Sequence, residues 1–233
     1  IEKDSPSETY EFKSNTVILP ADEFSNAYFE DIDTCVTGFS YGRDEYTENF
    51  SKDVTVQREG STNILLMYGG DSKHGAFDFK KLAGAGFDYV ALGSLRKPKH
   101  MVKNRMAYPG SPEPVSHLDT GKHGYIYGQI IHGETRIKWE PVACREYINL
   151  GLEVKPEYTA RQIEGAIRKQ IDKMGTQNIY KIILKGEKGK GVKPVFDNLP
   201  EEYMIYSVVD NTMFNYNADS LMTVSYTHLT LPT

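Results

Sequence analysis

Cysteines and long apolar runs are scarce in this sequence of 233 residues. It has only two cysteines, Cys35 and Cys144, without C-x-x-C spacing, so neither a disulfide framework nor a cysteine-based zinc site is indicated. This cysteine usage fits a reducing cytoplasm, which is the expected location. No apolar run approaches ~18 residues, so no membrane span is expected. The sequence also lacks internal repeats and low-complexity segments.

The overall composition is that of an ordinary globular protein. The chain is 39% hydrophobic and 25% charged, and its length suggests one large or two modest domains. The formal net charge of −5 argues against a surface that coats nucleic acid throughout, and leaves room for a local basic groove.

The stretch from Asn63 to Ser111 carries the clearest pattern. Ile64–Met67 is a short apolar run that ends in a tyrosine and two glycines, and Tyr89–Leu92 is a second run that ends in Gly93. Apolar runs this short, closed by glycines, predict interior strands. Residues just beyond such strands lie at the rim of a sheet, where α/β proteins commonly place their chemistry.

Three ordered motifs in this stretch resemble one protein family. F-D-Y-V-A-L-G occupies residues 87–93, K-P follows at 97–98, and Y-P-G-S at 108–111. Together they are similar to the C-terminal half of SbcD-type DNA repair exonucleases, which are calcineurin-like metallophosphoesterases. The looser resemblance extends from about Asn15 to Leu221. It implies an α/β fold: part of a four-layer phosphoesterase sandwich, followed by a small α+β capping domain.

Three positions depart from the family pattern. Family histidines that bind two catalytic metal ions, typically manganese, correspond to Tyr68, Ser94 and Arg96 here. Tyrosine and serine are poor neutral ligands, and arginine does not lose its proton. A unit positive charge about 4 Å from a divalent ion costs ~8 kcal/mol at an effective dielectric constant near 20. The resemblance therefore implies a manganese enzyme, while these residues make manganese binding doubtful.

Arg96 has two interpretations. In the first, its guanidinium replaces an ion, and either pairs with carboxylates or holds a phosphate bidentately. In the second, the site has been lost and the side chain points to solvent. Asp71, His74 and His100 are weak candidates for substitute metal ligands, because isolated polar-loop histidines are usually only solvated.

A basic cluster lies beside these positions. We define it as Arg96, Lys97, Lys99, Lys103 and Arg105, with His100 among them. A solvated loop and a DNA phosphate contact are equally good interpretations, and the family's active-site rim favours the second. A second set, Lys185, Lys188, Lys190 and Lys193, alternates with glycines and predicts a mobile loop. A flexible connection is the simpler interpretation of this loop, and contact with a DNA backbone is the alternative.

The remaining pattern gives four segments. Residues 1–14 are expected to form a linker, 15–145 the C-terminal half of the phosphoesterase domain, 146–223 the capping domain, and 224–233 a non-native tail. The tail, Val224–Thr233, resembles translated sequencing adapter, so its His228 is set aside. The family's first metal motifs do not occur in the sequence, which is therefore interpreted as a C-terminal fragment.

Within the expected phosphoesterase part, strands are predicted at Thr16–Leu19 and Thr34–Tyr41. Asp44–Gly60 is predicted to be a surface helix or loop, and Phe77–Ala85 a short helix that ends before Gly86. Gly124–Ile131 and Arg136–Pro141 are predicted to form a hairpin.

The expected capping domain shows a β-α-β pattern. Strands are predicted at Tyr147–Val154, Ile179–Leu184 and Tyr203–Val209. Between the first two, Thr159 and Gln162 form a capping box. They open a helix whose apolar stripe contains Ile163, Ala166, Ile167, Ile171 and Met174.

The resemblance implies a subunit of an SbcD-like DNA double-strand-break repair nuclease, which hydrolyses DNA phosphodiester bonds. The three replaced histidine positions imply that its metal site is impaired, so whether the chain is an enzyme stays open. The alternative is a non-catalytic DNA-binding or scaffold subunit of an SbcC-type ATPase complex. A phosphoesterase acting on small substrates is disfavoured by the capping-domain resemblance. DNA and the ATPase are the expected partners, with a homodimer as a further possibility.

Overall fold

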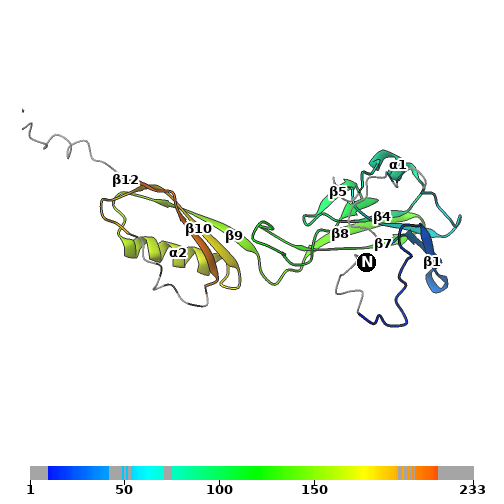
Figure 1. The fold of residues 1–233 in the computed structure, drawn as a ribbon, viewed down its shortest axis with the longest axis horizontal. Helices are drawn as coiled ribbons and strands as arrows, with labels where there is room; N and C mark the ends of the chain where they lie inside the picture. Colours follow the sequence, from blue (N-terminus) through cyan, green and yellow to red (C-terminus); the bar gives the residue numbers. More distant parts are fainter. Residues whose placement is uncertain are drawn as a thin grey trace, which may run out of the picture. The chain divides into compact units, whose positions relative to one another are not determined.

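The chain divides into two compact units, each described here by itself (Figure 1). The computed structural model describes residues 10–41, 49, 51, 54–70, 75–193, 196, 199, 201 and 203–214. Unit 1 consists of residues up to 115 together with 122–143, and unit 2 of residues 116–121 and those from 144 onward. Among the helices of these described residues, none is long and apolar enough to cross a membrane.

Unit 1 is built on a six-stranded sheet with the order β1-β2-β3-β4-β6-β5. Its strands are β1 (Ser25–Phe29), β2 (Thr34–Gly38), β3 (Thr62–Tyr68), β4 (Tyr89–Gly93), β5 (Lys99–Val102) and β6 (Met106–Tyr108). The four central strands are parallel, while β1 and β5 are antiparallel at the two sides. A 3-10 turn, η2 (Glu30–Ile32), joins β1 to β2.

One face of this sheet forms the core of unit 1 with helix α1 (Phe79–Gly84). Leu65 and Met67 of β3 and Leu82 of α1 are almost fully buried there. Asp78 caps the helix by accepting hydrogen bonds from the backbone of Lys80 and Lys81. The predictions of both interior strands and of this helix are confirmed.

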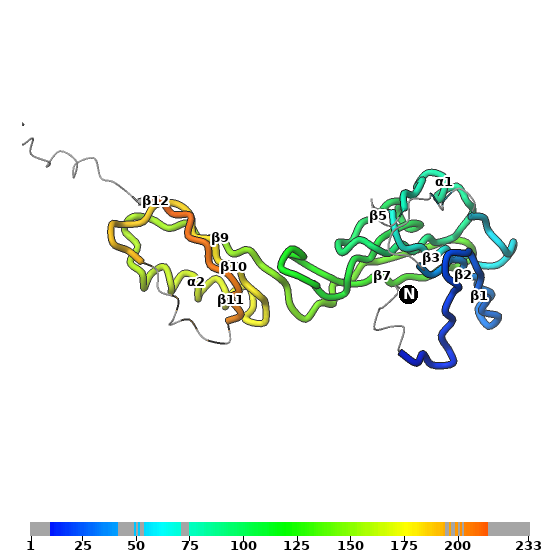
Figure 2. Tube along the Cα trace, in the orientation of Figure 1, coloured from blue at the N-terminus to red at the C-terminus, as the bar shows by residue number. Residues whose placement is uncertain are grey.

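The other face carries a hairpin made of β7 (Gly124–Ile131) and β8 (Glu134–Pro141), which confirms the predicted hairpin. The Thr135 hydroxyl donates to the carbonyl of Asp88 at 2.8 Å, and the Trp139 indole donates to the carbonyl of Pro109 at 2.9 Å. Asp88 precedes β4 and Pro109 follows β6, so these contacts place β8 along those two strands (Figure 2).

Several local predictions for unit 1 are wrong. Thr16–Leu19 is not a strand, and the strand on the outer side of β2 is β1 instead. The basic segment after β4 is not a loop throughout, because β5 and β6 form an antiparallel hairpin there. In the predicted surface segment Asp44–Gly60, Val54 is only 5% exposed and belongs to the core. Its apolar side chain packs inward, although the charged residues around it in the sequence indicated a surface segment.

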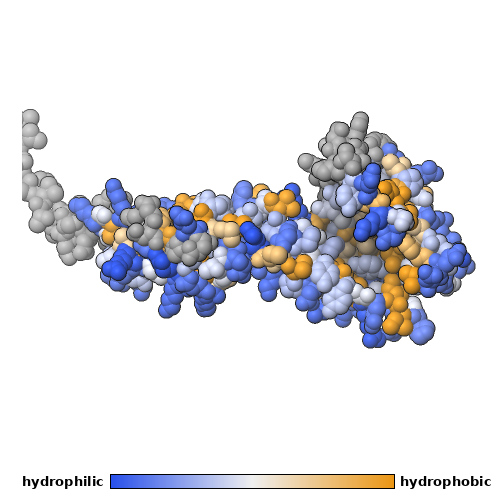
Figure 3. All heavy atoms as spheres, turned by 90° about the horizontal axis from the view of Figure 1, so that it is seen from below, coloured by the Kyte–Doolittle hydropathy of each residue, from blue (hydrophilic) through white to orange (hydrophobic). Residues whose placement is uncertain are grey.

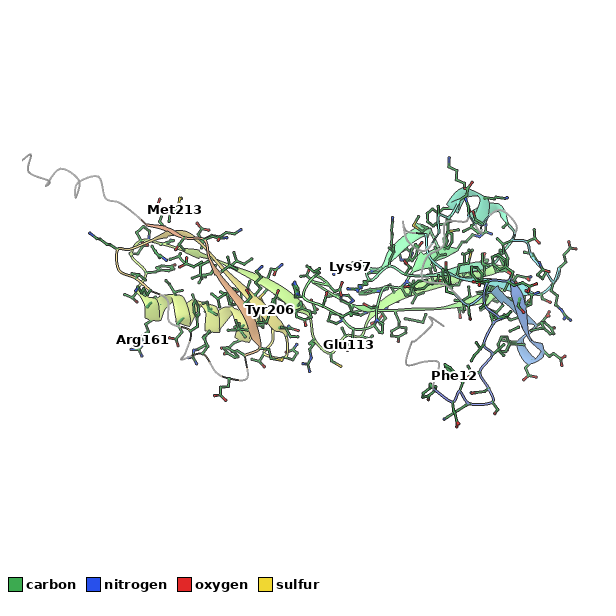
Figure 4. All side chains as sticks on the ribbon, viewed as in Figure 1. Phe12, Lys97, Glu113, Arg161, Tyr206 and Met213 are labelled. Carbon is green, nitrogen blue, oxygen red and sulfur yellow. The ribbon has the colours of Figure 1, made fainter. Side chains whose placement is uncertain are left out.

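Unit 2 contains the predicted β-α-β arrangement. The strands β9 (Tyr147–Val154), β10 (Ile179–Lys188) and β11 (Ile205–Asp210) are parallel, with β10 in the centre and a short β12 (Met213–Phe214) beside its end. Helix α2 (Ala160–Met174) opens with the predicted capping box and ends at Gly175. Arg161 and Tyr206, on α2 and β11, are labelled in Figure 4.

Two predictions for unit 2 are wrong in detail. Met174 does not belong to the buried stripe as predicted, since it is 45% exposed and the stripe ends one turn earlier at Ile171. The predicted mobile lysine loop begins inside a strand, since Lys185 and Lys188 belong to β10. Lys188 is buried and forms an ion pair with Asp210, so its ammonium group is engaged within the unit.

The fold is α/β-like, because it combines sheets of mixed strand direction with a small number of helices. The expectation for the tail Val224–Thr233 lies outside the described residues, as do Asp71 and His74.

Candidate functional site

The candidate site is the C-terminal edge of the six-stranded sheet, defined here as the residues at and just beyond the ends of β3, β4 and β6. β3 and β4 are parallel, with Tyr68 paired to Gly93. Tyr68 and Ser94 therefore lie at the same edge, and Arg96 follows on the loop that leaves it. The structure brings together the three positions that the family pattern singled out.

Tyr68 lies across the end of β4. A side-chain carbon added to Gly93 would come within 2.9 Å of the Tyr68 ring, so the ring rests directly on that glycine. The ring of Tyr41 packs edge-on against Tyr68, with 5.5 Å between centroids. Tyr68 is still 45% exposed.

Ser94 has a strained backbone. Its φ angle is +104°, in a region that residues with a side chain rarely adopt. Backbone outliers of this kind cost about 1–3 kcal/mol and tend to occur at functional sites. The turn holds it there, because the backbone N–H of Gly69 donates to the carbonyl of Gly93, 3.1 Å away.

The loop that carries Arg96 and Lys97 rests on the Y-P-G-S turn. The Ser111 backbone N–H donates to the Arg96 carbonyl at 3.1 Å. Gly110 has a positive φ, and a side-chain carbon there would lie 2.8 Å from that same carbonyl oxygen, so only glycine fits. The turn acts as the support for the loop.

A buried histidine completes this support. His123 is 0% exposed, and its Nδ1 lies 2.9 Å from the Ser111 hydroxyl and 3.2 Å from the Ser111 carbonyl. Both contacts are satisfied together when Nδ1 carries the proton. The sequence analysis missed His123, because nothing in the local pattern distinguishes it from an exposed histidine.

Aromatic hydroxyl groups fix the end of β3. Tyr108 donates to the carbonyl of Gly69 at 2.8 Å, and Tyr41 donates to the carbonyl of Tyr68. Both tyrosines are buried, and Tyr108 is 1% exposed. Because buried backbone carbonyls need hydrogen-bond donors, the hydroxyls hold the edge in one geometry.

The described residues at this edge are not the ligands that manganese prefers. Tyr68, Ser94 and Arg96 offer a phenol, a hydroxyl and a fixed cation where manganese prefers carboxylates and imidazoles. Among the described residues, no three His, Cys, Asp or Glu side chains are grouped so that they could hold a metal. His100 lies on β5 opposite Ala107, and is exposed.

The structure divides the basic cluster between the two ends of the β5–β6 hairpin. Arg96, Lys97 and Lys99 lie near the C-terminal edge, where Lys97 is exposed (Figure 4). Lys103 and Arg105 lie at the other end, roughly 13 Å further along a strand that rises about 3.3 Å per residue. The five residues therefore do not form one continuous patch.

Arg105 has a structural contact of its own. It donates to the carbonyl of Phe87 at 2.9 Å, just before β4 begins. Together with Lys103, Asp88, Glu134 and Arg136 it lines a cavity of about 400 Å³. Glu134 is ion-paired with Arg136, so charges of both signs share this end of the sheet.

No protein-family model matches the chain, and no curated protein matches it.

Proposed function

We propose that the chain is part of an SbcD-like subunit that processes DNA double-strand breaks, and that its two-metal site is impaired. In this proposal unit 1 belongs to a four-layer calcineurin-like sandwich and unit 2 is the capping domain. The observation that carries the proposal is the pairing of Tyr68 with Gly93. It brings the ends of two motif-bearing strands to one edge, where Ser94 is strained and Arg96 and Lys97 follow.

The chemistry left at this edge suits phosphate better than a metal ion. A guanidinium group can hold a phosphate through two parallel hydrogen bonds, and a lysine adds a point charge. Arg96 and Lys97 are both exposed, and the carbonyl of Arg96 is held by Ser111. The loop thus has a backbone held by a hydrogen bond and two exposed cationic side chains.

The alternative function is a non-catalytic DNA-binding or scaffold subunit that works with an SbcC-type ATPase. Arg96 favours it, because a permanent positive charge at a ligand position opposes metal binding. Under both functions the partners are DNA and the ATPase, a homodimer is possible, and the location is cytoplasmic.

Restoring the histidines separates the two functions. In the full-length gene product, Tyr68→His, Ser94→His and Arg96→His together should recover manganese binding, measured by calorimetric titration, and manganese-dependent cleavage of a DNA duplex. Single restorations should recover little, because an arginine or a missing ligand remains.

The same measurements on the unmutated protein can contradict the proposal. Tight binding of two manganese ions, with cleavage of DNA, would overturn the proposal of an impaired site. A triple variant that folds but neither binds manganese nor cleaves would favour the scaffold function.

A further inference from the structure

The second face of the six-stranded sheet is apolar and only partly covered. Along β3, Leu65 and Met67 point to the core and are 0% and 1% exposed. Leu66 and Tyr68 point the other way and are 50% and 45% exposed. Figure 3 shows apolar side chains gathered around a hollow in unit 1.

This face forms the floor of a groove of about 710 Å³. Ile64, Leu66 and Tyr89 line the floor, and β7 contributes Ile126, Gly128 and Ile130. Of the described residues that line the groove, none carries a formal charge. Burial raises the pKa of the Tyr89 hydroxyl, consistent with a poorly hydrated floor. A charged ligand would lose its hydration here without gaining a partner.

The wall of the groove is the free edge of β7. In the described part of the chain β7 pairs only with β8. The hairpin has a two-residue turn, His132 and Gly133, and Ile131 is paired with Glu134. In an antiparallel pair, hydrogen-bonded and non-hydrogen-bonded positions alternate from that turn.

This alternation decides which backbone groups point outward. Tyr127 and Gln129 direct their N–H and C=O groups toward β8, while Ile126, Gly128 and Ile130 direct theirs away from it. The same parity holds at the start of the strand, where the N–H of Gly124 donates to the carbonyl of Ser111. Outward-directed donors and acceptors on an edge strand are a template for one more strand.

We propose that this groove binds an extended, uncharged polypeptide segment, which pairs with the free edge of β7 and covers the floor formed by β3 and β4. Alternate side chains of such a segment point down onto Ile64, Leu66 and Tyr89, so they must be apolar. The outward-directed groups span Ile126 to Ile130, which sets a length of about five to seven residues. The recognition mode is strand addition, with affinity from the backbone and selectivity from the alternate apolar positions.

A second copy of this chain does not fit as the donor. A two-fold axis that paired β7 with its symmetry mate would keep both hairpins in one layer. The mate's own six-stranded sheet would then occupy the same space as the floor formed by β3 and β4. The strand must therefore come from a segment that brings no second sheet beneath it. The inference depends on unit 1 alone, not on the proposed function.

Hydrogen exchange of the 233-residue chain tests the proposal. The probe is a nine-residue peptide in which valine alternates with threonine, with a lysine at each end for solubility. With saturating peptide, the amides of Ile126, Gly128 and Ile130 should exchange about tenfold more slowly, as expected for a newly formed strand hydrogen bond. Those of Tyr127 and Gln129, already paired with β8, should change little.

Two variants and a control make the result decisive. Ile130→Pro removes an outward-directed N–H without touching the ladder to β8, and Leu66→Glu places a charge on the floor. Both should abolish the protection. Leu118→Glu changes a leucine that is 75% exposed in unit 2 and should leave it intact.

Three outcomes would overturn the proposal. The first is binding without protection of the three outward-directed amides, and the second is equal protection in Leu66→Glu and wild type. The third is a concentration-dependent dimer, seen by sedimentation, that Leu66→Glu dissolves, because a second copy would then cover the groove. Melting temperatures of all variants confirm that they are folded.

Discussion

The two edges of the six-stranded sheet are braced in similar ways but differ in backbone strain and in the charge of the neighbouring loops. At the N-terminal edge, defined as the residues just before β2, β3, β4 and β6, side chains of one strand tie down the backbone of the next. The Asp88 carboxylate accepts from the backbone N–H of Asn63 at 2.8 Å, and Arg105 donates to Phe87. At the C-terminal edge, tyrosine hydroxyls hold the backbone in the same way.

The difference in strain lies in Ser94. Two described residues next to the central parallel strands are not glycine and still have a positive φ angle. They are Asp33, at +42°, and Ser94, at +104°. Asp33 adopts the ordinary left-handed conformation that aspartate tolerates, whereas Ser94 does not. The C-terminal edge thus has a strained backbone at Ser94 next to exposed cations. The hydrogen bonds at the N-terminal edge serve only to hold the strands together. Substitutions at each edge test this division.

The largest effect is expected from Asp88→Ala at the N-terminal edge. Asn63 is 3% exposed, so its N–H would lose a charged partner in a buried place. The free energy of unfolding should fall by about 2–3 kcal/mol, measured by urea denaturation. Asp88→Asn keeps an acceptor oxygen and should lose clearly less. Equal losses would mean that this hydrogen bond does not brace the edge.

A smaller effect is expected from Tyr108→Phe at the C-terminal edge. The carbonyl of Gly69 would lose its buried donor, so the free energy of unfolding should fall by about 1–2 kcal/mol. Tyr125→Phe is the matched control, because Tyr125 is 45% exposed. If both variants are equally stable, the hydroxyl of Tyr108 does not hold the end of β3.

Ser94→Gly should stabilise the protein. Glycine adopts positive φ without strain, and this gain exceeds its larger loss of chain entropy by roughly 0.5–1 kcal/mol. Ser94→Ala keeps the strain and should show no gain. A Ser94→Gly variant that is less stable than wild type in thermal unfolding would contradict the claim that the backbone of Ser94 is strained.

The smallest effect concerns Asp33 at the N-terminal edge. Hydrogen bonds donated by the hydroxyls of Ser61 and then Tyr28 lower the pKa of its carboxyl group. A lowered pKa contributes stability above the ordinary aspartate range, which is lost as the pH falls through the folded-state value. The melting temperature of Asp33→Asn should therefore lie below wild type at neutral pH and converge with it in strong acid. A constant difference across that range would contradict this origin.

The sequence predicted the elements whose signals are local. The glycines that close β3 and β4, the capping box at Thr159 and Gln162, and the hairpin of β7 and β8 each depend on a few adjacent residues. Two of the predictions that failed concern residues with distant partners. Lys188 lies at the end of β10 and is ion-paired with Asp210, and Val54 belongs to the core of unit 1.

The candidate site was predicted in part for the same reason. The strand ends brought Tyr68, Ser94 and Arg96 to one edge, as the pattern of runs indicated. The bracing by Tyr41, Tyr108 and His123 could not be predicted, because each contacts a backbone group far away in the sequence. The division of the basic cluster resulted from an unexpected turn between β5 and β6.

The salt dependence of DNA binding tests the central claim most directly. Binding of a labelled duplex by the 233-residue chain is followed by fluorescence anisotropy over a series of salt concentrations. Lys97→Ala with Lys99→Ala, at the C-terminal edge, should weaken binding and reduce the slope of log K against log salt by about 2. Lys103→Ala at the opposite end, and Lys80→Ala with Lys81→Ala on α1, should leave the slope unchanged. An unchanged slope in the Lys97 and Lys99 variant, or a larger loss in Lys103→Ala, would contradict the assignment of the C-terminal edge to DNA.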